Sequence, residues 1–207
     1  MKILALPLGA FQTNCYIVAE EETGEALVFD PGSNGDELVA FIEKEGFKPK
    51  AVVLTHGHLD HIGGVQAIID AFRIPVYMHE ADVPMLTDPD LNRSILMPPH
   101  IVVKVDDLRL LNEGDTLTCG KLTFRVLETP GHTPGGICFY TDGFVIAGDT
   151  LFNGSIGRTD FPGGDYDTLI DAIRTKLYTL PDDTEVYPGH GPATQIAYEK
   201  TSNPFVR

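Results

Sequence analysis

Cysteine and long apolar stretches are both scarce in this chain. Three cysteines, Cys15, Cys119 and Cys138, occur among 207 residues, and none belongs to a CxxC pair. A sparse, odd number does not suit a disulfide framework, so we expect buried free thiols and a cytoplasmic protein. No apolar stretch approaches the roughly 20 residues that a membrane span requires, so we expect no membrane partner.

Basic residues are also few. Fifteen Lys and Arg stand against 30 Asp and Glu, for a net charge of -15. This balance argues against a nucleic-acid partner, because phosphate binding depends on clustered Lys and Arg. It still allows a local basic patch around an anionic substrate. The length predicts a single domain over residues 1–207.

The N-terminal segment "MKILALPLGAF" imitates a signal peptide, because Lys2 precedes an apolar run. Pro7 and Gly9 interrupt that run, and another strand-like segment follows at once. We therefore expect the first hairpin of the fold rather than a leader.

Repeats and linkers are absent too, and short apolar runs dominate what is present. Segments 36–46, 62–72 and 165–180 have helical spacing, and the proline-rich segment 80–100 predicts a short helix followed by a surface loop. About ten strands with helices between them predict an α/β fold of packed sheets with helices outside. The strand-like runs are "KILALPL", "NCYIVA", "EALVFD", "KAVVLT", "IPVYM", "IVVKV", "KLTFRVLE", "GICFYT", "FVIAGD" and "TEVYPG".

Four of these runs end in residues that can bind a metal ion. Sites in layered α/β folds gather where strands end, so we expect the side chains to meet. Imidazole and carboxylate suit zinc, iron or manganese. The candidate ligands are His56, His58, Asp60, His61, His132, Asp149 and His190.

The spacing within "THGHLDH" indicates two adjacent ions. His56 and His58 are two apart in an extended segment and point to the same side. Asp60 and His61 follow as the chain turns, so they face a neighbouring point. A carboxylate such as Asp149 can bridge two ions, and a shared water would become hydroxide near neutral pH.

Each residue alone has an ordinary explanation. Asp60 could be the N-cap of the helix at 62–72, His132 and His190 could be turn histidines, and Asp149 an Asx-turn residue. Together the set is hard to explain without a metal, because HxHxDH is a specific pattern. Two histidines lack such neighbours and are interpreted as structural, namely His79 and His100.

These motifs closely resemble those of the metallo-β-lactamase superfamily. The matching segments are "FDPG" at 29–32, "THGHLDH" at 55–61, "PGHTPGG" at 130–136, "AGDTLF" at 147–152 and "PGHGP" at 188–192. Through "GSIGRTDFPGGD" at 154–165 the chain is most similar to bacterial glyoxalase II-like hydrolases. The resemblance implies a four-layer αββα sandwich of two mixed sheets, with a dinuclear site between them.

The resemblance also assigns roles to the candidate ligands. It implies two divalent ions, for which we expect zinc first, with iron or manganese also suited. The first ion would be held by His56, His58 and His132, and the second by Asp60, His61 and His190. Asp149 would bridge them, and Asp30 would orient the ligands from behind.

The activity implied is hydrolysis of a small-molecule thioester, such as S-lactoylglutathione or a related acyl thiol. In the family a bridging hydroxide, held with the help of Asp60 and Asp149, attacks the carbonyl while the metals neutralise the oxyanion. Full-length glyoxalase II enzymes carry a C-terminal helical domain, which we do not expect here, since little more than the short helix-like segment "TQIAYEK" follows His190. Arg158 lies near the position of a cation for the glutathione carboxylate, although an exposed loop arginine would look the same.

Three alternatives stay open. A persulfide dioxygenase of the same fold would hold one iron with His56, His132 and Asp149, and would consume oxygen. A nuclease or other phosphodiesterase is disfavoured by the acidic charge. A purely structural metal module would more often present a closed set of four ligands.

Overall fold

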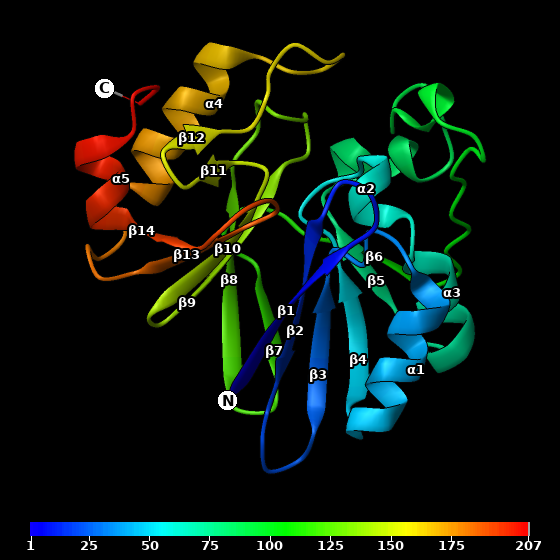
Figure 1. Ribbon diagram of the computed structural model, residues 1–207. Helices are drawn as coiled ribbons and strands as arrows, with labels where there is room; N and C mark the ends of the chain where they lie inside the picture. Colours follow the sequence, from blue (N-terminus) through cyan, green and yellow to red (C-terminus); the bar gives the residue numbers. More distant parts are fainter. Residues whose placement is uncertain (207) are drawn as a thin grey trace.

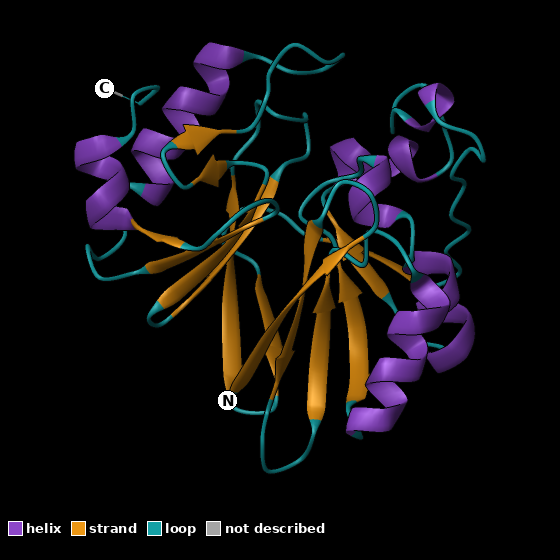
Figure 2. Ribbon diagram, viewed as in Figure 1, coloured by secondary structure: helices purple, strands orange, loops and turns teal. Residues whose placement is uncertain are grey.

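Two six-stranded sheets face each other in the computed structural model, and helices cover the outer face of each sheet (Figures 1 and 2). The structure describes residues 1–206. The αββα sandwich and the mixed sheets are therefore confirmed. No helix within the described residues is both long enough and apolar enough to span a bilayer.

The first sheet is formed by the N-terminal half of the chain. Strands β1 to β3 pair antiparallel, and β3 to β6 pair parallel. In order, the strands are β1 (Lys2–Leu8), β2 (Thr13–Ala19), β3 (Glu25–Phe29), β4 (Lys48–Val53), β5 (Val76–Met78) and β6 (Leu108–Leu110). Its helices are α1 (Gly35–Glu45), α2 (Leu59–Ile62) and α3 (Val65–Phe72), with 3-10 turns at Glu80–Leu86 and Ser94–Leu96. The N-terminal segment is strand β1, as expected.

The second sheet is antiparallel except where β10 pairs with β13. In spatial order its strands are β14 (Thr194–Gln195), β13 (Glu185–Pro188), β10 (Phe144–Gly148), β9 (Ile137–Thr141), β8 (Leu122–Glu128) and β7 (Thr116–Cys119). Strands β11 (Leu151–Phe152) and β12 (Ser155–Ile156) form a separate ribbon. The helices here are α4 (Tyr166–Ala172), its wider π-type continuation (Ile173–Leu177) and α5 (Ile196–Ser202).

Alternating strand residues divide the core into three apolar layers. Successive side chains of a strand point to opposite faces, so Ile17 packs beneath α1 and α3 while Val18 faces the second sheet. Phe29 lies between the sheets, with its ring centroid 5.5 Å from that of Phe124 and 5.3 Å from that of Phe139. The third layer packs the second sheet against α4 and α5.

Two expectations about secondary structure were wrong. The helix expected at 62–72 begins at Leu59 and is interrupted at Gly63 and Gly64. A Cβ at Gly63 would lie 2.3 Å from the Gly32 carbonyl oxygen, and the Gly64 amide donates to the Pro31 carbonyl at 2.7 Å. The break therefore lets the "FDPG" segment pack against the helix.

The strand expected at 101–105 does not form either. The Val103 amide donates to the Leu86 carbonyl (2.7 Å), and the Lys104 amide donates to the Gln66 side chain (2.9 Å). These amides are used outside the sheet, so the segment runs extended without joining it. The helix expected at 165–180 is present, but its second half widens into the π-type turn.

Candidate metal centre

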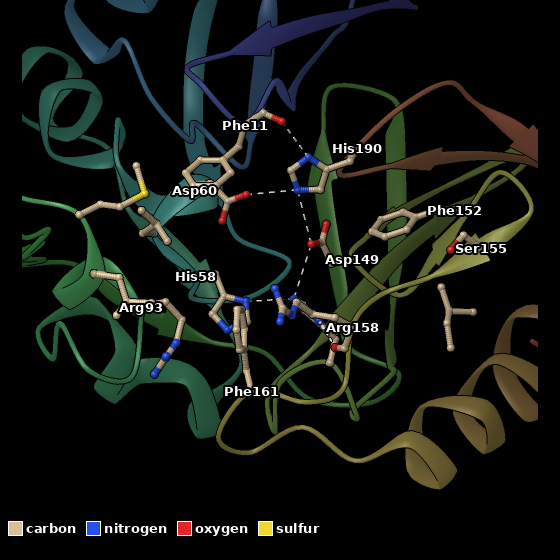
Figure 3. A pocket seen from close by; sticks show the side chains of 15 residues that line it. Phe11, His58, Asp60, Arg93, Asp149, Phe152, Ser155, Arg158, Phe161 and His190 are labelled. Atoms are coloured by element: carbon tan, nitrogen blue, oxygen red, sulfur yellow. Dashed lines mark hydrogen bonds and ion pairs between the residues drawn. The ribbon is translucent and has the colours of Figure 1, made fainter.

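The structure brings all seven candidate ligands together at one end of the sandwich. Figure 3 shows four of them, namely His58, Asp60, Asp149 and His190. The loop after β4 and the short helix α2 supply four of the seven, and the loops after β8, β10 and β13 supply one each. These side chains are His56, His58, Asp60, His61, His132, Asp149 and His190. They meet because each motif directly follows a strand, and these strands end at the same edge.

The candidate ligands form three overlapping groups. Within each group the ligand atoms lie within 4.8 Å of one another. The groups are His56, His58 and His132; Asp60, His61 and His190; and His56, His61 and Asp149. The third group shares a histidine with each of the other two, so the donors are arranged around two neighbouring points.

Asp149 lies between the two outer groups. Its Oδ1 is 3.3 Å from Nε2 of His61, and its Oδ2 is 3.5 Å from Nε2 of both His132 and His190. One carboxylate thus faces histidines of both groups, which is the geometry that a bridging ligand needs.

Four of the imidazole rings are oriented by an interaction at Nδ1. Where the neighbour is a carbonyl or carboxylate, Nδ1 must donate, so in the neutral ring Nε2 carries the lone pair that a metal needs. The neighbours are the Thr55 hydroxyl for His56 (3.1 Å), the Asp30 carboxylate for His61 (2.9 Å), the Arg158 carbonyl for His132 (2.7 Å) and the Phe11 carbonyl for His190 (3.2 Å).

Unpaired buried atoms test whether these residues suit a metal. Among the described residues, Nε2 of His56 and Nε2 of His58 are buried without a hydrogen-bond partner, while Nε2 of His61 and Oδ1 of Asp149 face each other at 3.3 Å. A buried polar atom left unpaired costs about 1–3 kcal/mol. Divalent ions would satisfy these atoms, and neutral imidazole with carboxylate is a donor set that such ions bind. The residues therefore fit a divalent metal.

Asp60 is not a helix N-cap, so that interpretation was wrong. It lies inside α2, whose N-cap position is occupied by His58. Its Oδ2 accepts a hydrogen bond from the Thr13 hydroxyl (3.1 Å) and lies 3.2 Å from Nε2 of His190. The carboxylate thus points to the second group rather than to the helix backbone.

Asp30 supports the centre from behind. Its carboxylate accepts hydrogen bonds from the Thr55 amide (2.8 Å) and hydroxyl (2.6 Å), as well as contacting His61. Its backbone φ of 47° is in the left-handed region. Such a conformation persists in a non-glycine residue only where surrounding contacts hold it.

Electrostatics separate the two groups of histidines. Burial and the neighbouring histidines hold the pKa of His56 well below its usual range and lower that of His58 to about 3. Burial also acts to lower the pKa of His61, but the carboxylates around it raise the value well above its usual range. The pKa of His190 rises to about 9 despite burial, through its contacts with Asp149 and Asp60.

Asp82 is a further buried residue that contacts the ligand loops. Its carboxylate accepts hydrogen bonds from the Gly57 amide (3.1 Å), the Gly135 amide (2.7 Å) and the Thr133 hydroxyl (2.8 Å). It therefore ties the loop of His56 and His58 to that of His132. Asp82 could not be recognised from the sequence, because it lies in no motif and acts only through contacts distant in sequence.

A cavity of about 500 Å³ opens beside the candidate ligands. This is within the range of small-molecule sites. Its apolar wall comprises Phe11, Leu59, Leu96, Met97, Phe152, Ile156 and Phe161. Arg158 lines it as well, and its guanidinium pairs with Asp160 at 2.8 and 2.7 Å. His79, which contacts Glu128, and the exposed His100 lie outside this lining.

Comparison with known proteins decides the family. Residues 8–190 match the family model described as the Metallo-beta-lactamase superfamily. The chain belongs to this superfamily. The predicted resemblance is thereby confirmed.

Two curated relatives align over essentially the whole chain. The "Probable metallo-hydrolase YqgX" of Bacillus subtilis is 39% identical, covering 100% of this chain and 98% of the relative. The "Hydroxyacylglutathione hydrolase GloC" of Haemophilus influenzae is 40% identical with the same coverage. Both names are those of hydrolases, and the first also indicates a metal.

Solved structures show the same architecture. The BLEG-1 B3 metallo-beta-lactamase is 43% identical with a TM-score of 0.92, covering 99% of each chain. TTHA1623, solved in a di-iron-bound form, is 38% identical with a TM-score of 0.87, covering 98% of this chain and 99% of its own. ETHE1 from Myxococcus xanthus is 30% identical with a TM-score of 0.81, covering 99% of this chain and 84% of its own.

Proposed function

We propose that this protein hydrolyses a small-molecule thioester with two divalent metal ions, zinc being the first expectation. The observation that carries the proposal is the convergence of buried imidazoles and carboxylates beside a cavity of about 500 Å³, with Nε2 of His56 unpaired and Nε2 of His61 facing Oδ1 of Asp149 at 3.3 Å. The whole-length similarity to a protein named hydroxyacylglutathione hydrolase supports the thioester as substrate.

The side chains divide between two metal positions. When bound, the ions polarise the scissile carbonyl and turn water into a nucleophile near neutral pH. Asp149, with histidines of both groups within 3.5 Å, would contact both ions. The first ion would be held by His56, His58 and His132, and the second by Asp60, His61 and His190.

The rest of the chain orients the substrate and limits its contact with water. Phe11, Phe152 and Phe161 line the cavity beside the ligand set. Such a wall lowers the local dielectric constant and strengthens the electrostatic interactions with the reacting carbonyl. A free thiol has a pKa of about 8.5, so a thiolate leaves near neutral pH without a dedicated proton donor. Asp60 and Asp149 both have a lowered pKa, so they are ionised and cannot donate a proton, and a thiolate does not require one.

Two alternatives have specific support. One iron held by His56, His132 and Asp149 would give a persulfide dioxygenase, and the di-iron-bound form of TTHA1623 supports iron as the metal but not a single ion. BLEG-1 is described as a B3 metallo-beta-lactamase, so a β-lactam is the second alternative substrate. The presence of Asp60, His61 and His190 in a second group favours the dinuclear hydrolase over one iron.

One set of parallel assays tests the proposal. Protein purified without added metal is analysed for metal and assayed for thiol release from S-lactoylglutathione, oxygen uptake with glutathione persulfide, and opening of nitrocefin. We expect thioester hydrolysis to dominate, with Asp149→Asn inactive and the exposed Asp106→Asn unchanged. Oxygen uptake with no thioester hydrolysis at any metal loading would instead establish the dioxygenase.

A further inference from the structure

Two arginines line the cavity, although the chain as a whole is strongly acidic. Arg93 and Arg158 both line it, in a protein with a net charge of -15. Around them the lining is apolar apart from Ser155 and the candidate ligands. Cations placed in such a lining attract anions.

The two arginines differ in how far their charge is already neutralised. Arg158 makes two hydrogen bonds to the Asp160 carboxylate. Arg93 has no ion pair within residues 1–206, and its Nη1 donates only to the Asp90 carbonyl at 3.1 Å. Its Nε is buried and has no partner among the same residues. In this part of the chain no carboxylate neutralises Arg93, whereas Asp160 neutralises Arg158, so Arg93 is the one of the two whose charge is free to attract an anion.

The backbone around Arg93 is held in place by buried contacts. Arg93 has a φ of 70°, a left-handed conformation that a non-glycine residue keeps only where surrounding contacts hold it. The preceding Asn92 is fully buried, and its carbonyl accepts a hydrogen bond from the Leu59 amide at 2.8 Å. Leu59 begins helix α2, which carries Asp60 and His61. The position of Arg93 is therefore linked to the candidate metal centre.

Phe161 connects the guanidinium groups to the candidate ligands. The guanidinium carbon of Arg93 lies 4.9 Å from the ring centroid, and that of Arg158 lies 3.6 Å from it. The His58 ring packs edge-on against the same phenyl ring, with the centroids 5.7 Å apart. Figure 3 shows Phe161 between the two arginines and close to His58. Arg93 and the candidate ligand His58 thus both pack against the ring of Phe161.

We propose that Arg93 binds a carboxylate of the substrate, and that the preferred thioesters are those that carry one. This inference rests on the proposed hydrolase function and specifies its substrate class. A guanidinium presents paired N–H donors that match the two oxygens of a carboxylate. The carboxylate could belong to the thiol carrier or to the acyl group, and the test separates these sources.

The test compares three thioesters in wild-type protein and in Arg93→Gln. S-lactoylglutathione carries carboxylates on the thiol, S-succinyl-N-acetylcysteamine carries one on the acyl group, and S-lactoyl-N-acetylcysteamine carries none. A charge-assisted hydrogen bond is worth about 1.5–3 kcal/mol, so KM should rise roughly 10- to 100-fold for the anionic substrate that Arg93 binds. We expect kcat to change little, and the uncharged thioester to be unaffected. The substrate whose KM rises shows whether the bound carboxylate belongs to the thiol carrier or to the acyl group.

Two variants serve as controls. Arg93→Lys keeps a positive charge and should recover part of the loss in KM. Arg174→Gln removes one charge from the exposed surface of the π-type turn and should leave all three substrates unchanged. Because position 93 has a left-handed backbone conformation, thermal unfolding of each variant checks that the protein still folds. Equal effects of Arg93→Gln on charged and uncharged thioesters would overturn the proposal.

A binding measurement separates this inference from the hydrolase proposal. Calorimetry on metal-free protein with S-methylglutathione and with succinate reports carboxylate binding without turnover. We expect one of these probes to bind, and Arg93→Gln to weaken it at least tenfold. Binding without hydrolysis of any thioester would refute the hydrolase and leave the role of Arg93 standing. Wild-type protein that binds neither probe would refute Arg93 as the carboxylate site.

Discussion

The Nδ1 atom of His61 lies 2.9 Å from Oδ2 of Asp30, and both side chains are buried. This contact holds the ring so that its Nε2 faces Asp149 at 3.3 Å. Asp30 belongs to "FDPG" and His61 to "THGHLDH", so two motifs distant in the chain meet in one interaction. The orientation of the candidate second metal position depends on it.

Asp30→Asn should therefore weaken that second position. An amide cannot accept all the hydrogen bonds that this carboxylate receives from Thr55 and His61. Loss of such an orienting partner lowers metal affinity or activity about 10- to 100-fold. Competition with a metal chelator measures the affinity, and Asp106→Asn is the control. Unchanged affinity for both ions would show that Asp30 does not orient the ligands.

Asp82→Asn should destabilise the protein even without metal. Three hydrogen-bond donors face this buried carboxylate, and an amide group would leave at least one unpaired. We expect the free energy of unfolding to fall by about 1–3 kcal/mol. Denaturant titration of metal-free protein measures the change. A variant as stable as wild type would mean that the two ligand loops do not depend on Asp82.

Two glycines of "PGHG" should respond differently to alanine. A Cβ at Gly189 would lie 2.2 Å from Oδ1 of Asp149 and 2.8 Å from Cε1 of His61, so Gly189→Ala should abolish metal binding. Gly191 has a φ of 73° but nothing within 4 Å of such a Cβ. Gly191→Ala should cost about 1–2 kcal/mol of stability and keep the metals. Metal analysis of both variants checks this, and similar metal contents would refute the steric argument.

The metal-free protein should be most stable near pH 6.5. The pKa of His190 is raised to about 9, so its contribution to stability is complete below its ordinary 6.5 and is lost as pH rises through 9. The pKa of His58 is lowered to about 3, so the unfolded state gains protons first and stability falls as pH drops from 6.5 toward 3. Melting temperatures of chelator-treated protein across pH 4–9 test both directions.

Bound metal should prevent the loss of stability at alkaline pH. An ion at the second position requires deprotonated His190, so the loaded protein should not lose stability between pH 6.5 and 9. A metal-free protein that becomes more stable over this interval would contradict the contacts of His190 with Asp60 and Asp149.

The sandwich and the convergence of candidate ligands could be predicted because both follow from local patterns. Each motif places its histidine or aspartate directly after a strand, as with His132 after β8 and Asp149 after β10. The packing of helices outside two sheets follows from short apolar runs alternating with helical spacing. The order of the layers follows from the resemblance to the metallo-β-lactamase superfamily.

The features that could not be predicted depend on contacts between distant segments. The helix break at Gly63 and Gly64 is imposed by the backbone of the "FDPG" segment, and the extended segment at 101–105 by partners outside the sheet. Asp82 and Arg93 carry no motif, and their importance is visible only from what their side chains contact or fail to contact.

If two ions act together, activity should follow the number of ions bound per chain, and a metal titration measures both. Metal-free protein is titrated with zinc while bound metal and thioester hydrolysis are measured in the same samples. We expect activity to reach its maximum at two ions per chain, and Asp60→Asn to bind one ion tightly with sharply reduced turnover. Full activity at one ion per chain, retained in Asp60→Asn, would contradict this expectation.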